Sequence, residues 1–213
     1  MPETSRSSGE TAYDALIMAL RNGAFVPGDR LREEDVAARL SLSRTPVREA
    51  LRRLESDGII EHRPRIGAVI RVLAHTELVE LYEMRTVLEA TAAEMAAQHG
   101  ATAEFDALEA MNDRIESARD DPATGAAINQ DFHRGLCLAA RNRFLVESAR
   151  ALNNALLLLG PSTYSDPARI DVVVQQHRDI ITALRARDGA AAAMAARQHL
   201  ETSLRHRLGS ASA

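Results

Sequence analysis

The chain has 213 residues, of which 46% are hydrophobic, a length that suits two small globular domains. Its single cysteine, Cys137, cannot form an internal disulfide, and no stretch is apolar enough to span a membrane. Residues 1–10 are polar and lack a signal-peptide core, so we expect a cytoplasmic protein with a flexible N-terminus over these residues.

The formal net charge of −4 does not exclude a nucleic-acid partner, because it averages unlike parts of the chain. Residues 44–71 hold 7 arginines against 4 acidic residues. A phosphate backbone responds to such a local excess within a Debye length of about 8 Å. The arginine-rich segment is therefore the first candidate for a binding surface.

Two short helices are expected ahead of this segment. Leu16 and Leu20 belong to the apolar stripe of the first helix, and Val36 and Leu40 to that of the second. The link 41–43 to a third helix is only a few residues long, as a helix-turn-helix requires.

The third helix, within residues 43–58, carries two faces of opposite chemistry. Its apolar residues recur at the spacing of a stripe that packs on a core, and they are Val47, Ala50, Leu51 and Leu54. Arg44, Arg48 and Arg52 recur every four residues along another side. This pattern is typical of a helix that reads the DNA major groove, and the plainer alternative is a surface helix with a solvated charged face.

Residues 59–72 predict a β-hairpin whose turn carries Arg63 and Arg65. One use of such a hairpin is a wing that reaches the neighbouring groove or the DNA backbone. The other is a structural hairpin that seals the three-helix core, and both can be true.

Three runs, residues 23–31, 43–51 and 57–59, resemble the winged helix-turn-helix of the GntR family of bacterial transcription regulators. The resemblance implies that the third helix contacts double-stranded operator DNA and that the hairpin is the wing. The DNA-binding residues that it implies are Arg44, Thr45, Arg48, Arg52, Arg65 and Gly67, with Thr45 on a phosphate. We expect a homodimer whose two-fold symmetry matches a short palindromic operator.

Beyond Val72 the chain is expected to be helical almost throughout, as an antiparallel bundle with short loops. About six helices are predicted, around residues 76–100, 105–115, 128–136, 144–159, 169–187 and 190–207. The predicted fold class is thus mainly α. A winged helix-turn-helix domain of three helices and a β-hairpin over 11–74 precedes an all-α domain over 75–208.

Three histidines of this bundle are predicted to face inward, and they are His133, His177 and His199. Asn129 lies one turn before His133, so its side chain points the same way. A single inward histidine is usually a hydrogen-bonded core residue. Three imidazoles and an oxygen from successive helices indicate instead a site for a divalent metal with positions left open.

Residues 83–89, 129–133 and 176–180 resemble the FCD effector domain found in the FadR-like branch of the GntR family. The resemblance implies a metal site made by Asn129, His133, His177 and His199. Zinc is the first expectation for the ion, with manganese and nickel as alternatives. The amide of Asn129 is a neutral, weaker ligand than a carboxylate, so we expect lower metal affinity or a site that an anionic effector completes.

Arg85 is the other candidate inside the bundle, because it shares a helix face with Leu81 and Leu88. Its guanidinium could hold an effector carboxylate beside the metal, and the alternative is an internal ion pair with Glu89 at i+4. Cys137 is most simply a core residue, with a thiol-ligand or redox role as the less favoured alternative.

The sequence thus predicts a transcription regulator, not an enzyme. We expect a repressor whose operator binding is relieved by a small carboxylate metabolite bound near the metal site. One alternative is a metal-responsive regulator in which the ion itself is the effector. The other is a helical-bundle metalloenzyme, since three histidines with open positions also suit catalysis, although no acidic residue is obviously placed as a general base.

Overall fold

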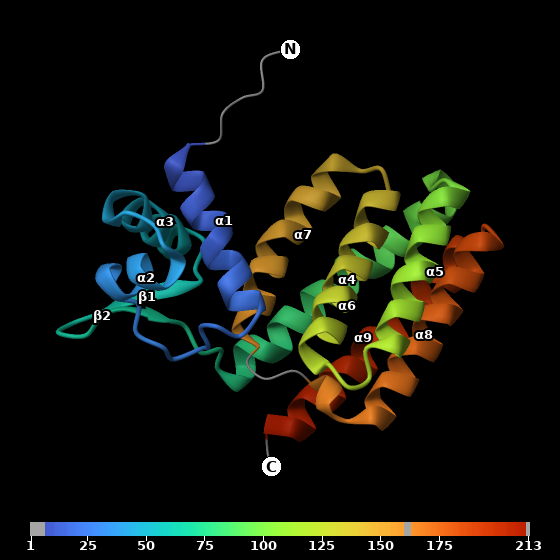
Figure 1. Ribbon diagram of the computed structural model, residues 1–213. Coiled ribbons are helices and arrows are strands. Elements are labelled where there is room, and N and C mark those ends of the chain that lie inside the picture. The colour runs from blue at the N-terminus through green and yellow to red at the C-terminus, as the bar shows by residue number, and fades with distance from the viewer. Residues whose placement is uncertain (1–6, 160–162, 212–213) are drawn as a thin grey trace. The chain divides into compact units, whose positions relative to one another are not determined.

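The computed structural model of the chain describes residues 7–159 and 163–211. The backbone forms two compact units, one of residues 1–74 with 153–160 and the other of residues 75–152 with 161–213. Figure 1 traces the helices and strands of each unit along the chain. In the described ranges no helix is long and apolar enough to cross a membrane.

Residues 7–74 of the first unit form three helices and a two-stranded hairpin, as predicted (Figure 1). The elements are α1 (Ser8–Arg21), α2 (Glu33–Leu40), α3 (Arg44–Ser56), β1 (Ile60–Arg63) and β2 (Gly67–Ile70). The strands pair antiparallel, from Ile60 opposite Ile70 to Arg63 opposite Gly67. At the start of α1, the Ser7 hydroxyl accepts from the Glu10 amide at 3.1 Å and the Glu10 carboxylate accepts from the Ser7 amide at 2.9 Å.

The apolar faces of these elements meet in one core. Leu16 of α1, Val36 of α2, Leu54 of α3 and Ile70 of β2 each have 0% exposed surface. The link between α2 and α3 turns at Ser41, whose φ of 56° lies in the left-handed region. The buried stripe of α3 therefore faces the core and leaves its arginines on the outside.

The second unit is a helical bundle, which confirms the predicted fold class (Figure 1). Its helices are α4 (His75–His99), α5 (Thr102–Ser117), α6 (Pro122–Ala139), α7 (Arg143–Ala155), α8 (Pro167–Arg185) and α9 (Gly189–Ala211), with the last residues of α7 assigned to the first unit. The expected single helix over 144–159 is shorter than predicted. It ends at Ala155, and η1 (Leu156–Leu158) follows as the tighter 3₁₀ turn that is frequent at helix ends.

Aspartate and proline together fix the starts of two bundle helices. The Asp121 carboxylate accepts from the Thr124 amide at 3.1 Å at the start of α6, and the Asp166 carboxylate accepts from the Ala168 amide at 3.0 Å at the start of α8. A proline follows each aspartate, at a position where its missing N–H costs nothing. The direction of α6 and α8 is thereby set at their first turns.

Alanines allow α4 and α9 to pack closely. Ala92, Ala93 and Ala96 of α4 and Ala192 and Ala196 of α9 are at most 2% exposed. Larger side chains fill the interior beside them, and these are Phe105, Leu108, Phe132, Leu136, Ile180 and Leu184. The histidines described next lie on the inward faces of α6, α8 and α9.

Candidate nucleic-acid interface and candidate metal centre

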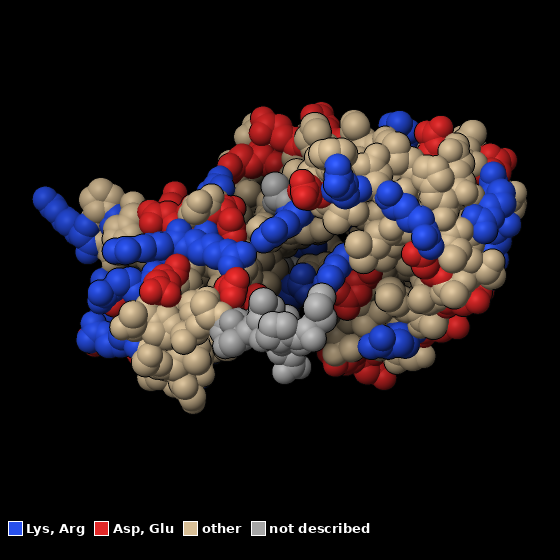
Figure 2. Space-filling view, turned by 90° about the horizontal axis from the view of Figure 1, so that it is seen from above, with Lys and Arg blue, Asp and Glu red and all other residues tan. Residues whose placement is uncertain are grey.

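The two faces of α3 separate as the sequence pattern predicts. Val47 and Leu54 are fully buried, whereas the Arg44 and Arg48 side chains are 58% and 54% exposed. Arg52 is also exposed, two turns after Arg44. In Figure 2, arginine side chains (blue) and acidic side chains (red) lie interspersed over the face of the molecule that is in view.

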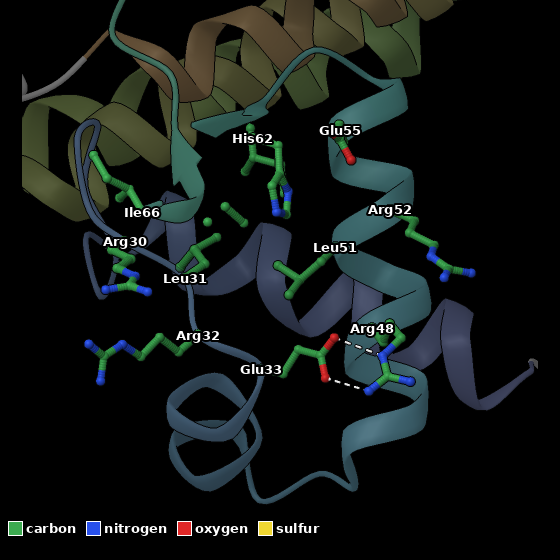
Figure 3. A pocket seen from close by; sticks show the side chains of 13 residues that line it. Arg30, Leu31, Arg32, Glu33, Arg48, Leu51, Arg52, Glu55, His62 and Ile66 are labelled. Carbon is green, nitrogen blue, oxygen red and sulfur yellow. Dashed lines mark hydrogen bonds and ion pairs between the residues drawn. The ribbon is translucent and has the colours of Figure 1, made fainter. Parts of the chain in front are cut away.

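A pocket of about 600 Å³ opens between the start of α2, the outer face of α3 and the hairpin (Figure 3). Its basic lining residues are Arg30, Arg32, Arg48, Arg52 and His62. Glu33 and Glu55 are the acidic residues of the lining. Cationic groups thus outnumber carboxylates here, and such a surface attracts phosphate.

Acidic side chains of α2 form ion pairs with two arginines of α3. Arg48 donates from Nε and Nη2 to the two carboxylate oxygens of Glu33, at 2.7 and 2.8 Å, as the dashed lines in Figure 3 mark. Arg44 lies 3.0 Å from the Glu34 carboxylate and 3.8 Å from that of Glu33. Both arginines are therefore paired with carboxylates of α2 in this structure.

The turn of the hairpin carries two more of the residues predicted to bind DNA, Arg65 and Gly67. Arg65 is exposed and takes a φ of 65°, and Gly67 follows with a φ of 97°, where a side chain would strain the backbone. Gly67 lines the pocket together with Arg48, while Thr45 is exposed in the first turn of α3. All six predicted DNA-binding residues therefore lie on the surface of this unit.

Three histidines from three helices meet inside the second unit. His133 of α6, His177 of α8 and His199 of α9 are 4%, 0% and 2% exposed, and one ligand nitrogen of each lies within 4.8 Å of the others. His133 Nε2 and His199 Nε2 are 3.3 Å apart. Two nitrogens each about 2.05 Å from a tetrahedral zinc ion would be separated by about 3.3 Å. This pair therefore fits a shared metal ion.

An oxygen atom lies close to the Nδ1 atom of each of the three histidines. The pairs are His133 Nδ1 with Glu89 Oε2 at 2.5 Å, His177 Nδ1 with Asn112 Oδ1 at 3.1 Å, and His199 Nδ1 with Gln176 Oε1 at 3.1 Å. The Asn112 and Gln176 oxygens accept hydrogen bonds, so they favour the tautomer of His177 and His199 with hydrogen on Nδ1 and leave the Nε2 lone pair of each for a metal. The His133–Glu89 contact is a close ion-pair contact without hydrogen-bond geometry. His177 Nε2 is buried and has no hydrogen-bond partner in the described residues.

The protonation of His177 and His199 also suits a metal. Burial lowers the pKa of His177 well below its ordinary value, and the charge of His133 adds to this effect. Burial likewise lowers the pKa of His199, with His177 as the next cause. Both imidazoles are therefore neutral at pH 7, the form that metal binding requires.

Asn129 lies one turn before His133 on α6, where the sequence predicted a fourth ligand. Its Oδ1 atom is buried and has no hydrogen-bond partner within the described part of the chain. An orphaned buried carbonyl oxygen is unfavourable unless it meets a ligand, an ion or water. The ligand role of Asn129 therefore stays a prediction, and this unpartnered oxygen one turn before His133 supports it.

Arg85 forms the internal ion pair that was the alternative to effector binding. Its Nε donates to Glu89 Oε1 at 2.8 Å, and both side chains are buried. Burial alone would raise the pKa of Glu89, but the charges of Arg85 and His133 outweigh burial and hold the pKa below its usual range. Glu89 thus links Arg85 to the histidine cluster.

Cys137 lies among apolar residues of α4, α6 and α7, including Ala92, Leu145 and Ala149. Burial raises the pKa of its thiol to about 12. A thiol that is protonated at pH 7 is a poor nucleophile and metal ligand. These features agree with the core role expected for Cys137.

Two of the orienting residues, Asn112 and Gln176, were not found by sequence reasoning. Asn112 interrupts the apolar stripe of α5 between Leu108 and Ile115, and a polar residue at such a position was a usable signal. Gln176 directly precedes His177 and belongs to the matched FCD segment, but its spacing gave no reason to link it to His199.

The fold, the exposed arginines of α3 and the buried histidine cluster together define a class of protein, a winged helix-turn-helix regulator with a separate helical domain. Residues 8–70 match the description "Bacterial regulatory proteins, gntR family", and residues 80–202 match the FCD domain. The chain belongs to the GntR family of bacterial regulators and carries an FCD domain. It is a DNA-binding transcription regulator and not an enzyme.

Similar proteins agree with this assignment. A relative in Paenarthrobacter nicotinovorans, named a probable D-xylose utilization operon transcriptional repressor, is 34% identical over 88% of this chain and 83% of its own length. The uncharacterized HTH-type transcriptional regulator YdhC of Bacillus subtilis (strain 168) is 29% identical over 91% of this chain and 86% of its own length.

Solved structures share the fold. E. coli McbR/YncC has a TM-score of 0.84 at 20% identity, covering 97% of this chain and 99% of that one. A putative GntR regulator from Rhodococcus sp. RHA1 has a TM-score of 0.82 at 26% identity, covering 96% of this chain and 99% of that one.

Domains of the FCD type can bind metal, and the three histidines of this chain could hold an ion.

Proposed function

We propose that the protein is a metal-containing repressor that acts as a homodimer and is released from its operator by a small carboxylate. The observation that carries this proposal is the histidine cluster, in which one ligand nitrogen of each ring lies within 4.8 Å of the others while Asn112 and Gln176 orient His177 and His199. A core histidine needs hydrogen-bond partners, but a converging set of lone pairs needs a cation. The relative named a repressor supports the direction of regulation.

The DNA-binding half of the proposal assigns operator contacts to Arg44, Thr45, Arg48, Arg52 and the hairpin residues Arg65 and Gly67. Exposed guanidinium groups on a helix with a buried opposite face suit the guanine edges and phosphates of a major groove. Two copies of α3 related by two-fold symmetry would read the halves of a palindrome. The domain boundaries that we propose are 11–74 for DNA binding and 75–208 for effector binding and dimerisation.

In the metal half of the proposal, His133, His177, His199 and Asn129 hold a divalent ion, for which zinc is preferred to manganese or nickel. A bound ion supplies a Lewis-acidic centre to which an effector oxygen can bind. The chain contributes three imidazoles, the neutral amide of Asn129, and the Asn112 and Gln176 acceptors that orient His177 and His199. An effector-binding role for Arg85 stays a prediction.

Operator release by the effector is a coupling between two sites. The effector must bind the DNA-free state more tightly, and a 100-fold change of operator affinity corresponds to about 2.7 kcal/mol. A regulator that responds to the ion alone is the second candidate, since the three histidines could hold an ion without any carboxylate. Chelation without any carboxylate would then change operator affinity.

The test is fluorescence anisotropy of the full-length, zinc-loaded protein on DNA from its own promoter region at fixed salt. Arg48→Ala should weaken specific binding by about 10- to 100-fold with the fold intact, because it removes a base or phosphate contact. Arg21→Ala, at the end of α1 in the same unit, is the matched control and should change little. Equal effects of the two substitutions would remove Arg48 from the reading surface.

A metal analysis completes the test. The wild-type protein should carry one zinc per chain after dialysis, and His177→Ala should carry none. Full zinc retention in that variant would refute the site. Operator affinity that stays unchanged on chelation and on addition of carboxylates would refute effector control while leaving DNA binding in place.

A further inference from the structure

Arg169 is a buried cation near the start of α8. It is 3% exposed, and its Nη2 donates to Ser203 Oγ of α9 at 2.6 Å. Its Nε and Nη1 atoms are buried and have no hydrogen-bond partner among residues 7–159 and 163–211. A guanidinium carries five N–H donors and stays charged, so most of the hydrogen-bonding capacity of Arg169 is unused.

Arg169 differs in this respect from the other buried arginine of the bundle. Arg85 has the Glu89 carboxylate at 2.8 Å. The pKa of Arg169 is lowered by burial, and the groups that act on it besides burial are Tyr164, Tyr82 and Arg207, none of which is a carboxylate. An uncompensated buried charge is strongly unfavourable, and an anion is the partner that would compensate it.

Arg169 also lies close to the candidate metal centre. Ser203, which accepts its hydrogen bond, follows His199 by four residues and so shares its face of α9. A group held by Arg169 and Ser203 would therefore lie about one helical turn, roughly 5 Å, from the level of the cluster.

We propose that Arg169 is the anion-binding residue of the effector site and that it takes the carboxylate of a bifunctional organic acid. The unused Nε and Nη1 donors bind the carboxylate, and the second oxygen donor of the same molecule reaches the metal held by the histidines. This assignment rests on the proposed effector function and deepens it. It places the effector between α8 and α9, whereas Arg85 serves as the buried partner of Glu89.

The experiment compares Arg169→Met with wild type and with Arg185→Met in the full-length, zinc-loaded protein. Arg185 is on the last turn of α8, and its guanidinium already binds Asp106 and Glu109 at 2.7 and 2.6 Å. Thermal unfolding is measured without ligand and with acetate, succinate and malate as probes. Calorimetric titration then gives the affinity for each probe.

Two results are expected. Without ligand, Arg169→Met should unfold about 2 °C or more above wild type, because an apolar side chain replaces an uncompensated charge. With succinate or malate, wild type and Arg185→Met should be stabilised, and Arg169→Met should bind at least tenfold more weakly. Acetate, which lacks the second donor, should bind more weakly than the two dicarboxylates.

Arg169→Met that unfolds earlier than wild type and still binds the probes would overturn the proposal and leave Arg169 as a structural residue. So would a wild-type protein that none of the three probes stabilises. Loss of probe binding in Arg85→Gln but not in Arg169→Met would move the anion site to Arg85. Probe binding that depends on Arg169 but leaves operator affinity unchanged would refute the proposed effector control and not the site.

Discussion

Asn112→Leu removes the oxygen that orients His177 and nearly preserves the size of the side chain. Asn112 is 1% exposed, its Nδ2 donates to the Val174 carbonyl at 3.0 Å, and its Oδ1 accepts from His177 Nδ1 at 3.1 Å. In the variant, the imidazole can bind a metal through Nε2 only with an unsatisfied buried Nδ1–H. That penalty is about 1–3 kcal/mol.

The expected result is a 10- to 100-fold loss of zinc affinity, the range typical when an outer-shell partner of a ligand is removed. This factor corresponds to about 1.4–2.7 kcal/mol, within the penalty worked from the lost hydrogen bond. The metal-free variant should also lose about 1–3 kcal/mol of its free energy of unfolding, because two buried hydrogen bonds are gone.

The assay is competition between the protein and a fluorescent zinc chelator, with urea unfolding of the metal-free protein as the stability measurement. Asn112→Asp is the matched control, since it keeps an acceptor for His177 and should retain zinc within about tenfold of wild type. Zinc affinity of Asn112→Leu within threefold of wild type would refute the reasoning, because the acceptor would then contribute nothing.

Three further predictions use other parts of the molecule. Asn129→Asp should raise zinc affinity about tenfold or more in the same competition assay, since a carboxylate replaces a neutral ligand; unchanged affinity would place the residue outside the site. The free energy of unfolding of the metal-free protein should decrease as the pH falls below about 6.5, because His177 and His199 stay neutral in the folded state but take up protons in the unfolded state. The expected decrease is about 1.4 kcal/mol per histidine per pH unit. The double variant with Gln at both His177 and His199 should show a smaller dependence of the free energy of unfolding on pH. An unchanged pH dependence would contradict this prediction. Glu33→Gln should tighten operator binding severalfold, because it frees Arg48 and removes a negative charge. The control is Glu55→Gln, which removes a negative charge from the same pocket without freeing Arg48. Equal effects of the two substitutions on operator affinity would show that freeing Arg48 adds nothing.

Periodicity predicted much of the fold. The buried stripe with Val47 and Leu54 fixed which face of α3 packs, and the remaining face therefore carried the arginines. The length of α7 was overestimated, because the leucines of 156–158 continue a helical pattern while the backbone tightens into a 3₁₀ turn. Apolar spacing alone does not separate the two kinds of turn.

The candidate metal centre was predictable only in part. Inward positions on α6, α8 and α9 identified the three histidines, since each shares a helix face with apolar neighbours. Which residue accepts from each Nδ1 depends on tertiary packing, as between Asn112 of α5 and His177 of α8, which are 65 positions apart. Local spacing carries no information on such pairs.

The neutral amide at Asn129 has a consequence for electroneutrality. With a divalent ion bound by three neutral imidazoles and that amide, the ligands cancel none of the positive charge of the ion. Glu89 does not cancel it either, because its carboxylate already faces the guanidinium of Arg85. Arg169 adds a further cation nearby. In such an interior the missing negative charge has to arrive with the bound molecule, so this domain should discriminate against neutral metabolites and favour dianions over monoanions.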